Sequence, residues 1–185
     1  MEILAVILAL LYLILAIRQN ILCWICAAIS TSIYIFIFIE AKLYMESLLN
    51  LFYFLMAIYG WYSWSAKKGY MTGLNISIWS LKNHFFAIAL LILISIFSGY
   101  FLSIYTDASY PYLDSMTTYF SIWATYLVAK KVLENWWYWL VIDLFSIAIY
   151  WSRDLEATAL LFVAYIFLIP FGMVAWKRSY NDQVT

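Results

Sequence analysis

Long apolar runs, separated by short polar or charged stretches, extend along the whole chain. Two prolines and five glycines are all that interrupt a sequence of 185 residues. A helix needs roughly 17–25 predominantly apolar residues to cross a bilayer, so the pattern predicts membrane-spanning helices rather than the alternating strands of a barrel. Seven runs qualify, at about 3–17, 21–39, 43–64, 84–104, 112–129, 135–152 and 157–176.

Composition supports this interpretation. Hydrophobic residues make up 68% of the chain and charged residues 11%, whereas a soluble domain is about 45–50% apolar and about 25% charged. One small core cannot bury that excess, which excludes a water-soluble globule. Glu2 stands where a signal peptide carries a basic residue, so the first run is predicted to be a retained helix. The net charge is zero, and nothing indicates a nucleic-acid partner.

The distribution of Lys and Arg predicts the orientation. Cytoplasmic loops carry an excess of basic residues. Only Lys42 and Arg153 fall on one side of the seven-span arrangement. The other side holds eight basic residues: Arg18, Lys67, Lys68, Lys82, Lys130, Lys131, Lys177 and Arg178. The C-terminus is therefore predicted to be cytoplasmic and the N-terminus external.

Two stretches of the chain resemble each other. Asn20-x3-Trp24 echoes Asn135-x3-Trp139. Further on, residues recur at a constant offset of 112: Leu43, Ser47, Leu48, Leu49, Tyr53 and Gly60 match Leu155, Ala159, Leu160, Leu161, Tyr165 and Gly172. The prediction is an all-α protein of 3+1+3 helices, with units at 1–64 and 111–178, a loop and linker helix at 65–110, and a cytoplasmic tail at 179–185. Parallel repeats of this kind are typical of transporters, with the site between the halves.

Asp143 is the strongest candidate for chemistry. It lies near the middle of its span, where an ionised carboxylate costs at least roughly 2.5–3.5 kcal/mol. Trp136, Trp139, Ser146 and Tyr150 share its helix face at 3–4 residue spacing. A carboxylate beside indoles suits a flat cationic ligand through charge and cation–π attraction. The structural alternative is a protonated Asp that bonds a neighbouring helix.

Other polar residues are weaker candidates. Asn50 and Tyr53 lie on one face of the third helix, where Asn50 either bonds a ligand or joins two helices. Ser115 and Thr118 either face a cavity or bond their own helix backbone.

Several motifs are predicted to be structural. Cys23 and Cys26 form a C-x-x-C inside a membrane helix, where packing is expected. His84 is the only histidine, and with no acidic partner near it in the sequence it predicts no metal site. No sequence motif indicates a cofactor or catalysis. The interfacial aromatic belt is predicted to comprise Trp61, Trp64, Trp79, Trp151 and Trp176.

A family resemblance rests on three motifs. Residues 58–64 (Ile-Tyr-Gly-Trp-Tyr-Ser-Trp), Asp114-Ser115 and residues 130–139, with Glu-Asn-Trp-x-x-Trp, are similar to the Pnu vitamin transporters, which import nicotinamide riboside or thiamine. The resemblance covers about residues 18–178. It implies a SWEET-like fold in the bacterial inner membrane and facilitated diffusion of an unphosphorylated vitamin that a cytosolic kinase then traps. It also implies binding roles for Trp136 and Trp139, with Asn135 directly before them.

The sequence departs from the riboside transporters at three positions. Those transporters tend to carry Gln, Asn and Asn where this chain has Asn50, Ala57 and Asp143. A carboxamide needs both a donor and an acceptor, which neither Asp⁻ nor Ala supplies. The departures therefore favour the thiamine-transporting branch, with nicotinamide riboside as the alternative.

Two other classes remain as remote alternatives. An intramembrane enzyme needs an acid pair at one depth, and Asp114 lies near the outer interface whereas Asp143 lies near the centre. A membrane scaffold has no use for a carboxylate at that depth. The predicted partners are the lipid bilayer, a small-molecule vitamin and, functionally, a vitamin kinase. A homo-oligomer is compatible with the sequence.

Overall fold

A computed structural model describes residues 2–40, 44–65, 74–106, 110–152 and 156–184, which form seven helices. They are α1 (Glu2–Ile17), α2 (Cys23–Glu40), α3 (Tyr44–Ser65), α4 (Leu81–Tyr105), α5 (Pro111–Ala129), α6 (Asn135–Trp151) and α7 (Glu156–Val184). The seven predicted helices are confirmed, with most ends within about three residues. The end of α7 differs, because residues 177–184 contain no glycine or proline and continue the helix.

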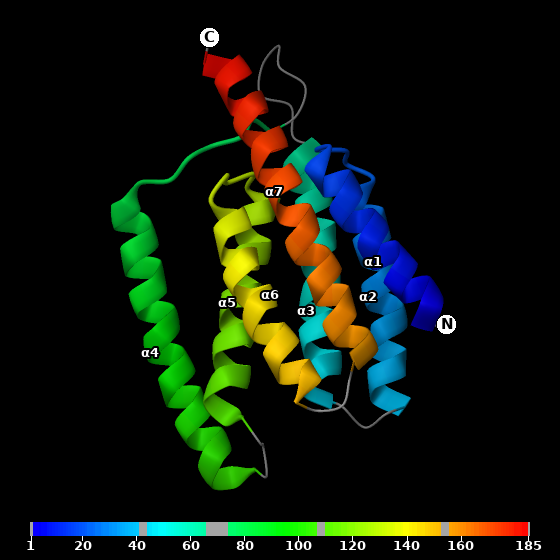
Figure 1. Ribbon diagram of the computed structural model, residues 1–185, viewed down its shortest axis with the longest axis vertical. Coiled ribbons are helices and arrows are strands. Elements are labelled where there is room, and N and C mark those ends of the chain that lie inside the picture. Colours follow the sequence, from blue (N-terminus) through cyan, green and yellow to red (C-terminus); the bar gives the residue numbers. More distant parts are fainter. Residues whose placement is uncertain (1, 41–43, 66–73, 107–109, 153–155, 185) are drawn as a thin grey trace.

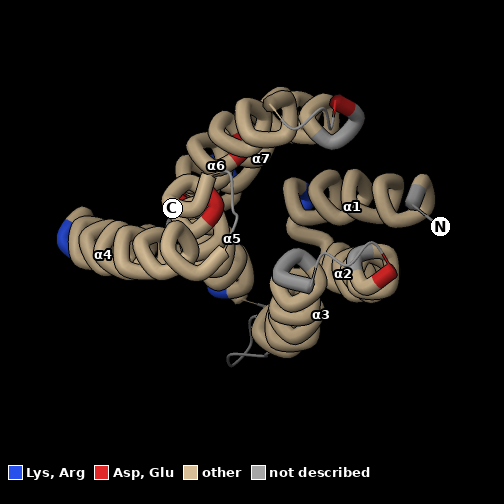
Figure 2. Tube along the Cα trace, turned by 90° about the horizontal axis from the view of Figure 1, so that it is seen from below, with Lys and Arg blue, Asp and Glu red and all other residues tan. Residues whose placement is uncertain are grey.

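The apolar surface of the helices agrees with a membrane location. By length and hydropathy, α4 and most of α7 can cross a bilayer, and α1 and α2 are shorter apolar helices. Only 11% of the most apolar stretch of α4 is buried, whereas a core helix of a soluble protein is mostly buried. Figure 2 shows few charged residues along the helices.

The helices form two groups of three. In the first group α2 packs against α1 and α3, and in the second α6 packs against α5 and α7. The groups meet where α3 packs on α5 and α1 on α7, while α4 lies outside and packs on α5 (Figures 1 and 2).

The helices α1, α3, α5 and α7 all end at the same side of the bundle, at the top of Figure 1. We call this side the basic end, because Arg18, Lys82, Lys130, Lys131, Lys177 and Arg178 lie there. The other four basic residues used to predict the orientation lie outside the described residues: Lys42, Lys67, Lys68 and Arg153.

Each group contains a tryptophan seated on a glycine. The Trp24 ring of α2 covers Gly60 of α3, and the Trp136 ring of α6 covers Gly172 of α7. A Cβ at either glycine would overlap the indole, so only glycine allows the two helices to approach this closely.

A second tryptophan completes each cluster. Trp64 meets Trp24 edge-on at 5.3 Å between ring centroids, and Trp176 meets Trp136 edge-on at 5.4 Å. Both pairs are therefore related by 112 residues. The sequence comparison that placed Trp24 opposite Trp139 was wrong by three residues, because one helical turn separates Trp136 from Trp139 and both are tryptophan.

The aromatic belt prediction is wrong for two of its members. Trp61 and Trp151 are exposed, as expected of interfacial residues. Trp64 and Trp176 are buried, and Trp176 has no exposed surface at all. Both lie near helix ends, where sequence position alone does not separate an interfacial indole from one that packs between helices.

The two turns at the basic end have the same backbone conformation. Gln19, between α1 and α2, and Lys131, between α5 and α6, adopt left-handed φ angles of 53° and 51°. Such residues cost about 1–3 kcal/mol each unless the surroundings stabilise them. The second turn is also joined to the segment before α4, because Ser77 and Val132 form an isolated parallel bridge.

Candidate functional site

Asp143 occupies the centre of the second group of helices. It is the ninth of the 17 residues of α6, and its side chain is 2% exposed. Its Oδ1 atom is buried and has no hydrogen-bond partner. An oxygen of this kind is rare in native structures, and in a membrane span it indicates a functional group.

Tyrosines of two other helices interact with this carboxyl group, and a tyrosine of a third helix interacts with them. Tyr53 of α3 and Tyr165 of α7 both interact electrostatically with Asp143, and Tyr12 of α1 interacts with both tyrosines. The Tyr53 hydroxyl also hydrogen-bonds Ser121 of α5. The site therefore draws on both groups of helices.

Three of these residues were missed in the sequence. Tyr53 was a candidate, but Tyr165, Tyr12 and Ser121 were not. The signal for Tyr165 was present, because it lies 112 residues after Tyr53 and each is the tenth residue of its helix. Nothing in the local sequence distinguishes Tyr12 or Ser121 from the many other polar residues of apolar helices.

The two tryptophans proposed as a clamp belong to one packed cluster and differ in burial. Trp139 is partly buried one turn from Asp143, toward the basic end. The Trp136 ring covers Gly172 and meets Trp176 edge-on, so it packs α6 against α7. A joint role of the two indoles in ligand binding stays a prediction.

Asn135 has a structural position. It is fully buried at the first residue of α6, and its Nδ2 donates to the Val132 carbonyl oxygen at 2.7 Å. The amide thus fixes the turn that starts α6. Its Oδ1 has no partner.

The remaining candidates lie on α3 and α5. Asn50 is partly buried one turn before Tyr53, and Ala57 is buried among the core residues around Trp24. Ser115 is buried with a hydroxyl that has no partner, and Thr118 is partly buried one turn further along α5. Ser115 thus keeps a hydroxyl available in the interior.

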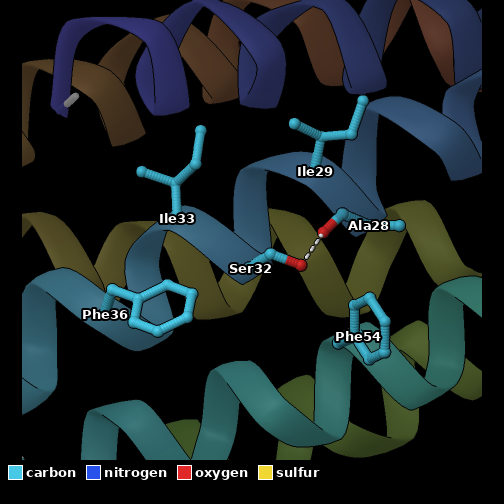
Figure 3. A pocket seen from close by; sticks show the side chains of 6 residues that line it. All are labelled: Ala28, Ile29, Ser32, Ile33, Phe36 and Phe54. Carbon is cyan, nitrogen blue, oxygen red and sulfur yellow. Dashed lines mark hydrogen bonds between the residues drawn. The ribbon is translucent and has the colours of Figure 1, made fainter.

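An open hollow lies between α2 and α3 (Figure 3). Its volume is about 340 Å³, and its lining residues are Ala28, Ile29, Ser32, Ile33, Phe36 and Phe54. Ser32 is its one hydroxyl residue, and that hydroxyl donates to the Ala28 carbonyl oxygen of its own helix at 2.7 Å. Because Ile29 and Phe36 are exposed and no lining residue is charged, this surface suits lipid chains rather than a charged vitamin.

His84 has an acidic partner, contrary to the sequence interpretation. Its Nε2 lies 3.7 Å from Glu134 Oε2, and its Nδ1 lies 2.9 Å from the Tyr138 hydroxyl. This buried contact joins α4 to α6. Within the described residues no group of three His, Cys, Asp or Glu side chains is arranged to hold a metal ion.

The arrangement around Asp143 is suited to a cationic aromatic ligand. A carboxylate supplies the counter-charge, and Trp139 with Tyr53 and Tyr165 supplies aromatic surface. Tyrosine hydroxyls both donate and accept hydrogen bonds, so they can meet an amide or a ribose hydroxyl.

Comparison with known proteins gives a consistent result. Residues 1–178 match the sequence profile of the nicotinamide mononucleotide transporter family. The nicotinamide riboside transporter PnuC of Escherichia coli K12 is 24% identical over 180 residues, which cover 84% of this chain and 75% of that protein. The riboflavin/roseoflavin transporter RibM of Streptomyces davaonensis is 25% identical over 134 residues, covering 69% and 62%.

The fold has a counterpart of known structure. The crystal structure of the vitamin B3 transporter PnuC superposes with a TM-score of 0.79 at 20% identity, covering 98% of this chain and 82% of that one. The fold is thus shared, and the profile match extends over nearly the whole sequence. We conclude that this chain belongs to the nicotinamide mononucleotide transporter family.

Proposed function

We propose that the protein carries a cationic vitamin across the bacterial cytoplasmic membrane by facilitated diffusion, and that its substrate is nicotinamide riboside. Family membership supports a vitamin transporter rather than an enzyme or scaffold. The similarity to PnuC favours the riboside over the thiamine that the sequence alone suggested. The observation that carries the proposal is the buried, unpartnered Oδ1 of Asp143.

Charge explains why this oxygen favours a cation. A carboxylate near the middle of a span is costly, and a pyridinium ring brought close to it offsets that cost. Lys and Arg of the described chain lie outside the helix centres, so the ligand itself would supply the positive charge. Trp139, Tyr53 and Tyr165 would then contact the ring, each desolvated cation–π contact contributing about 2 kcal/mol or more.

Hydrogen bonds would orient the rest of the ligand. Asp143 can accept from the carboxamide NH₂, and a tyrosine hydroxyl can donate to the carboxamide oxygen. Asn50, Ser115 and Thr118 would contact the ribose. In this proposal Trp136 and Asn135 shape the start of α6, where Trp136 packs on Gly172 and Asn135 donates to the Val132 carbonyl oxygen.

The proposal includes the orientation and the repeat. The basic end would face the cytoplasm, since basic residues concentrate in cytoplasmic loops. The two groups of helices would form a 3+1+3 parallel repeat with α4 as linker. The matching Trp24–Gly60 and Trp136–Gly172 contacts, 112 residues apart, support it. The site around Asp143 would then lie between the units, as parallel-repeat transporters place it.

Thiamine is the second candidate substrate. A specific observation favours it: Asp143 offers an acceptor, and the thiamine aminopyrimidine carries a donor NH₂ next to a cationic thiazolium. Both candidate substrates are cations, so the charge of Asp143 does not choose between them.

Uptake into proteoliposomes tests the proposal. Nicotinamide riboside should equilibrate across the membrane without energy input, and should accumulate as phosphate ester only when a riboside kinase and ATP are enclosed. Asp143→Asn should reduce uptake at least about tenfold, whereas Asp182→Asn, at the exposed end of α7, should not. Accumulation of unmodified riboside that a protonophore abolishes would contradict facilitated diffusion. Uptake of thiamine but not riboside would choose the second candidate.

A further inference from the structure

Two indoles join the groups of helices at the basic end. Trp64 of α3 donates its Nε1–H to the Val128 carbonyl oxygen of α5 at 3.3 Å. Trp176 of α7 donates to the Ala16 carbonyl oxygen of α1 at 3.0 Å. The two donor tryptophans are 112 residues apart, and so are the two acceptor residues. The centroids of the two tryptophan rings lie 6.1 Å apart. Each group of helices therefore holds the other by the same contact.

A third contact crosses between the groups at the same level. The Lys131 ammonium donates to Gln19 Oε1 at 3.2 Å, again over a separation of 112 residues. The same ammonium lies 4.6 Å from the centroid of the Trp64 ring. The two residues are also those with left-handed φ angles, so both turns are held in a conformation that brings these side chains together.

The Lys131 charge is buried without a counter-charge. Its side chain is 7% exposed, and within the part of the chain that the structure describes no carboxylate forms an ion pair with it. Burial lowers the pKa of Lys131 to about 8, against a smaller opposing effect of Cys23. An amide oxygen and a ring face compensate only part of the lost hydration of an ammonium. The contact is therefore one that opens readily.

These contacts lie at the basic end, close to one side of the candidate site. The core cluster that includes Trp64, Trp176 and Ala16 also packs against Trp139, one turn from Asp143. In the proposed transport, the ligand would leave Asp143 toward the basic end between the helices that these contacts join.

We propose that Gln19 and Lys131, with Trp64 and Trp176, form a latch that closes the transport path at the basic end, and that separation of Lys131 from Gln19 opens it. This rests on the proposed function, since a latch needs a path to close. Because the ammonium lacks a carboxylate, the closed state is held only weakly, which allows rapid exchange.

Gln19→Glu tests the latch by supplying the missing carboxylate. The variant should raise the melting temperature and slow riboside exchange across proteoliposomes at least about fivefold, because a buried ion pair is harder to separate than an amide contact. Its equilibrium affinity for the riboside should stay within about threefold of wild type, since the latch does not touch the ligand. Adding Lys131→Met to Gln19→Glu should reverse the slowing, because the pair can no longer form. Lys177→Met removes an exposed charge at the same end, and this variant should exchange riboside across the membrane as fast as wild type does.

Hydrogen exchange provides a readout that needs no substrate. Amide hydrogens in peptides that cover the Gln19 and Lys131 turns should exchange more slowly in Gln19→Glu than in wild type. In Lys177→Met they should exchange at the wild-type rate. The latch would be overturned if Gln19→Glu slowed hydrogen exchange of the turns but left riboside transport unchanged. It would also be overturned if the variant made both hydrogen exchange and riboside transport faster. If wild type transports thiamine but does not bind the riboside, the substrate proposal fails, and the latch stands only if Gln19→Glu slows thiamine exchange as well.

Discussion

The basic end and the middle of the bundle differ in how closely the two groups of helices match. At the basic end, Trp24 corresponds to Trp136 and Trp64 to Trp176, and each pair makes the same contacts. In the middle, the residue 112 positions before Asp143 is Thr31 of α2. The Thr31 hydroxyl donates to the Ala27 carbonyl oxygen of its own helix at 2.8 Å, whereas Asp143 Oδ1 has no partner.

We interpret this difference as one between the scaffold and the proposed site. Identical residues 112 positions apart make the same helix packing in both groups. Asp143 has a different residue at that separation, and its buried oxygen is the group that we propose for the ligand. Tyr53 and Tyr165 have features of both cases, because they are 112 residues apart and of the same type, and both interact electrostatically with Asp143.

The largest effect is expected from substitutions that disrupt the two tryptophan–glycine contacts. Gly172→Ala and Gly60→Ala should each lower the free energy of unfolding by about 1–3 kcal/mol, because the added Cβ overlaps a tryptophan ring. Helix propensity alone predicts the opposite sign, a gain of about 0.5–1 kcal/mol. Thermal unfolding of the purified protein in detergent measures the change. Trp136→Phe should partly rescue Gly172→Ala, and stabilisation by either glycine variant alone would refute the close approach.

The second effect is a dependence of folding stability on pH that arises from Lys131. A solvated lysine has a pKa of about 10.4, and burial lowers the pKa of Lys131 to about 8. Between these values the unfolded state binds more protons than the folded state, so stability rises with pH. Relative to Lys131→Met, wild type should gain about 1–3 kcal/mol between about pH 7.5 and pH 10. If the stabilities of the two proteins change equally with pH over this range, the Lys131 ammonium is solvated and not buried.

The third effect removes one hydrogen bond from each indole. Trp176→Phe and Trp64→Phe should each cost about 0.5–1.5 kcal/mol beyond the loss of ring area, because the Ala16 and Val128 carbonyl oxygens lose a donor. The two costs should agree closely if the environments correspond. Trp151→Phe, at an exposed position, is the control and should change the melting temperature little. Unequal costs would show that the two clusters differ in function.

The smallest effect is expected at Thr31. Thr31→Ala should leave riboside affinity within about threefold of wild type, because its hydroxyl is occupied by its own helix. A titration monitored by tryptophan fluorescence measures the affinity. A roughly tenfold loss would mean that Thr31 contacts the vitamin, and that the contrast with Asp143 is not the boundary between scaffold and site.

The helices were predictable from the sequence, whereas their partners were not. Apolar runs of bilayer length identified all seven helices, since the signal is local. In helices that are apolar on every face, however, no periodicity separates lipid-facing from interior positions, which is why Trp176 was assigned to the belt. The His84–Glu134 contact was missed for a related reason, because the two side chains are distant along the chain.

The candidate site was partly predictable. A charge in the middle of an apolar helix is conspicuous, so Asp143 was found from the sequence alone. The spacing that placed Trp136 and Trp139 on one face was correct, but spacing does not tell which residue meets a neighbouring helix. Tyr12 and Ser121 enter the site only through the packing of α1 and α5, which depends on contacts distant in the sequence.

The central claim is that Asp143 recognises the positive charge of the vitamin. Titration of the purified protein with nicotinamide riboside and with its reduced, uncharged dihydro form compares two ligands of nearly the same shape. Wild type should bind the cation at least about tenfold more tightly than the neutral form, and Asp143→Asn should lose that preference while Asp182→Asn keeps it. A wild type that binds both forms equally, or an Asp143→Asn variant that still prefers the cation, would contradict the account.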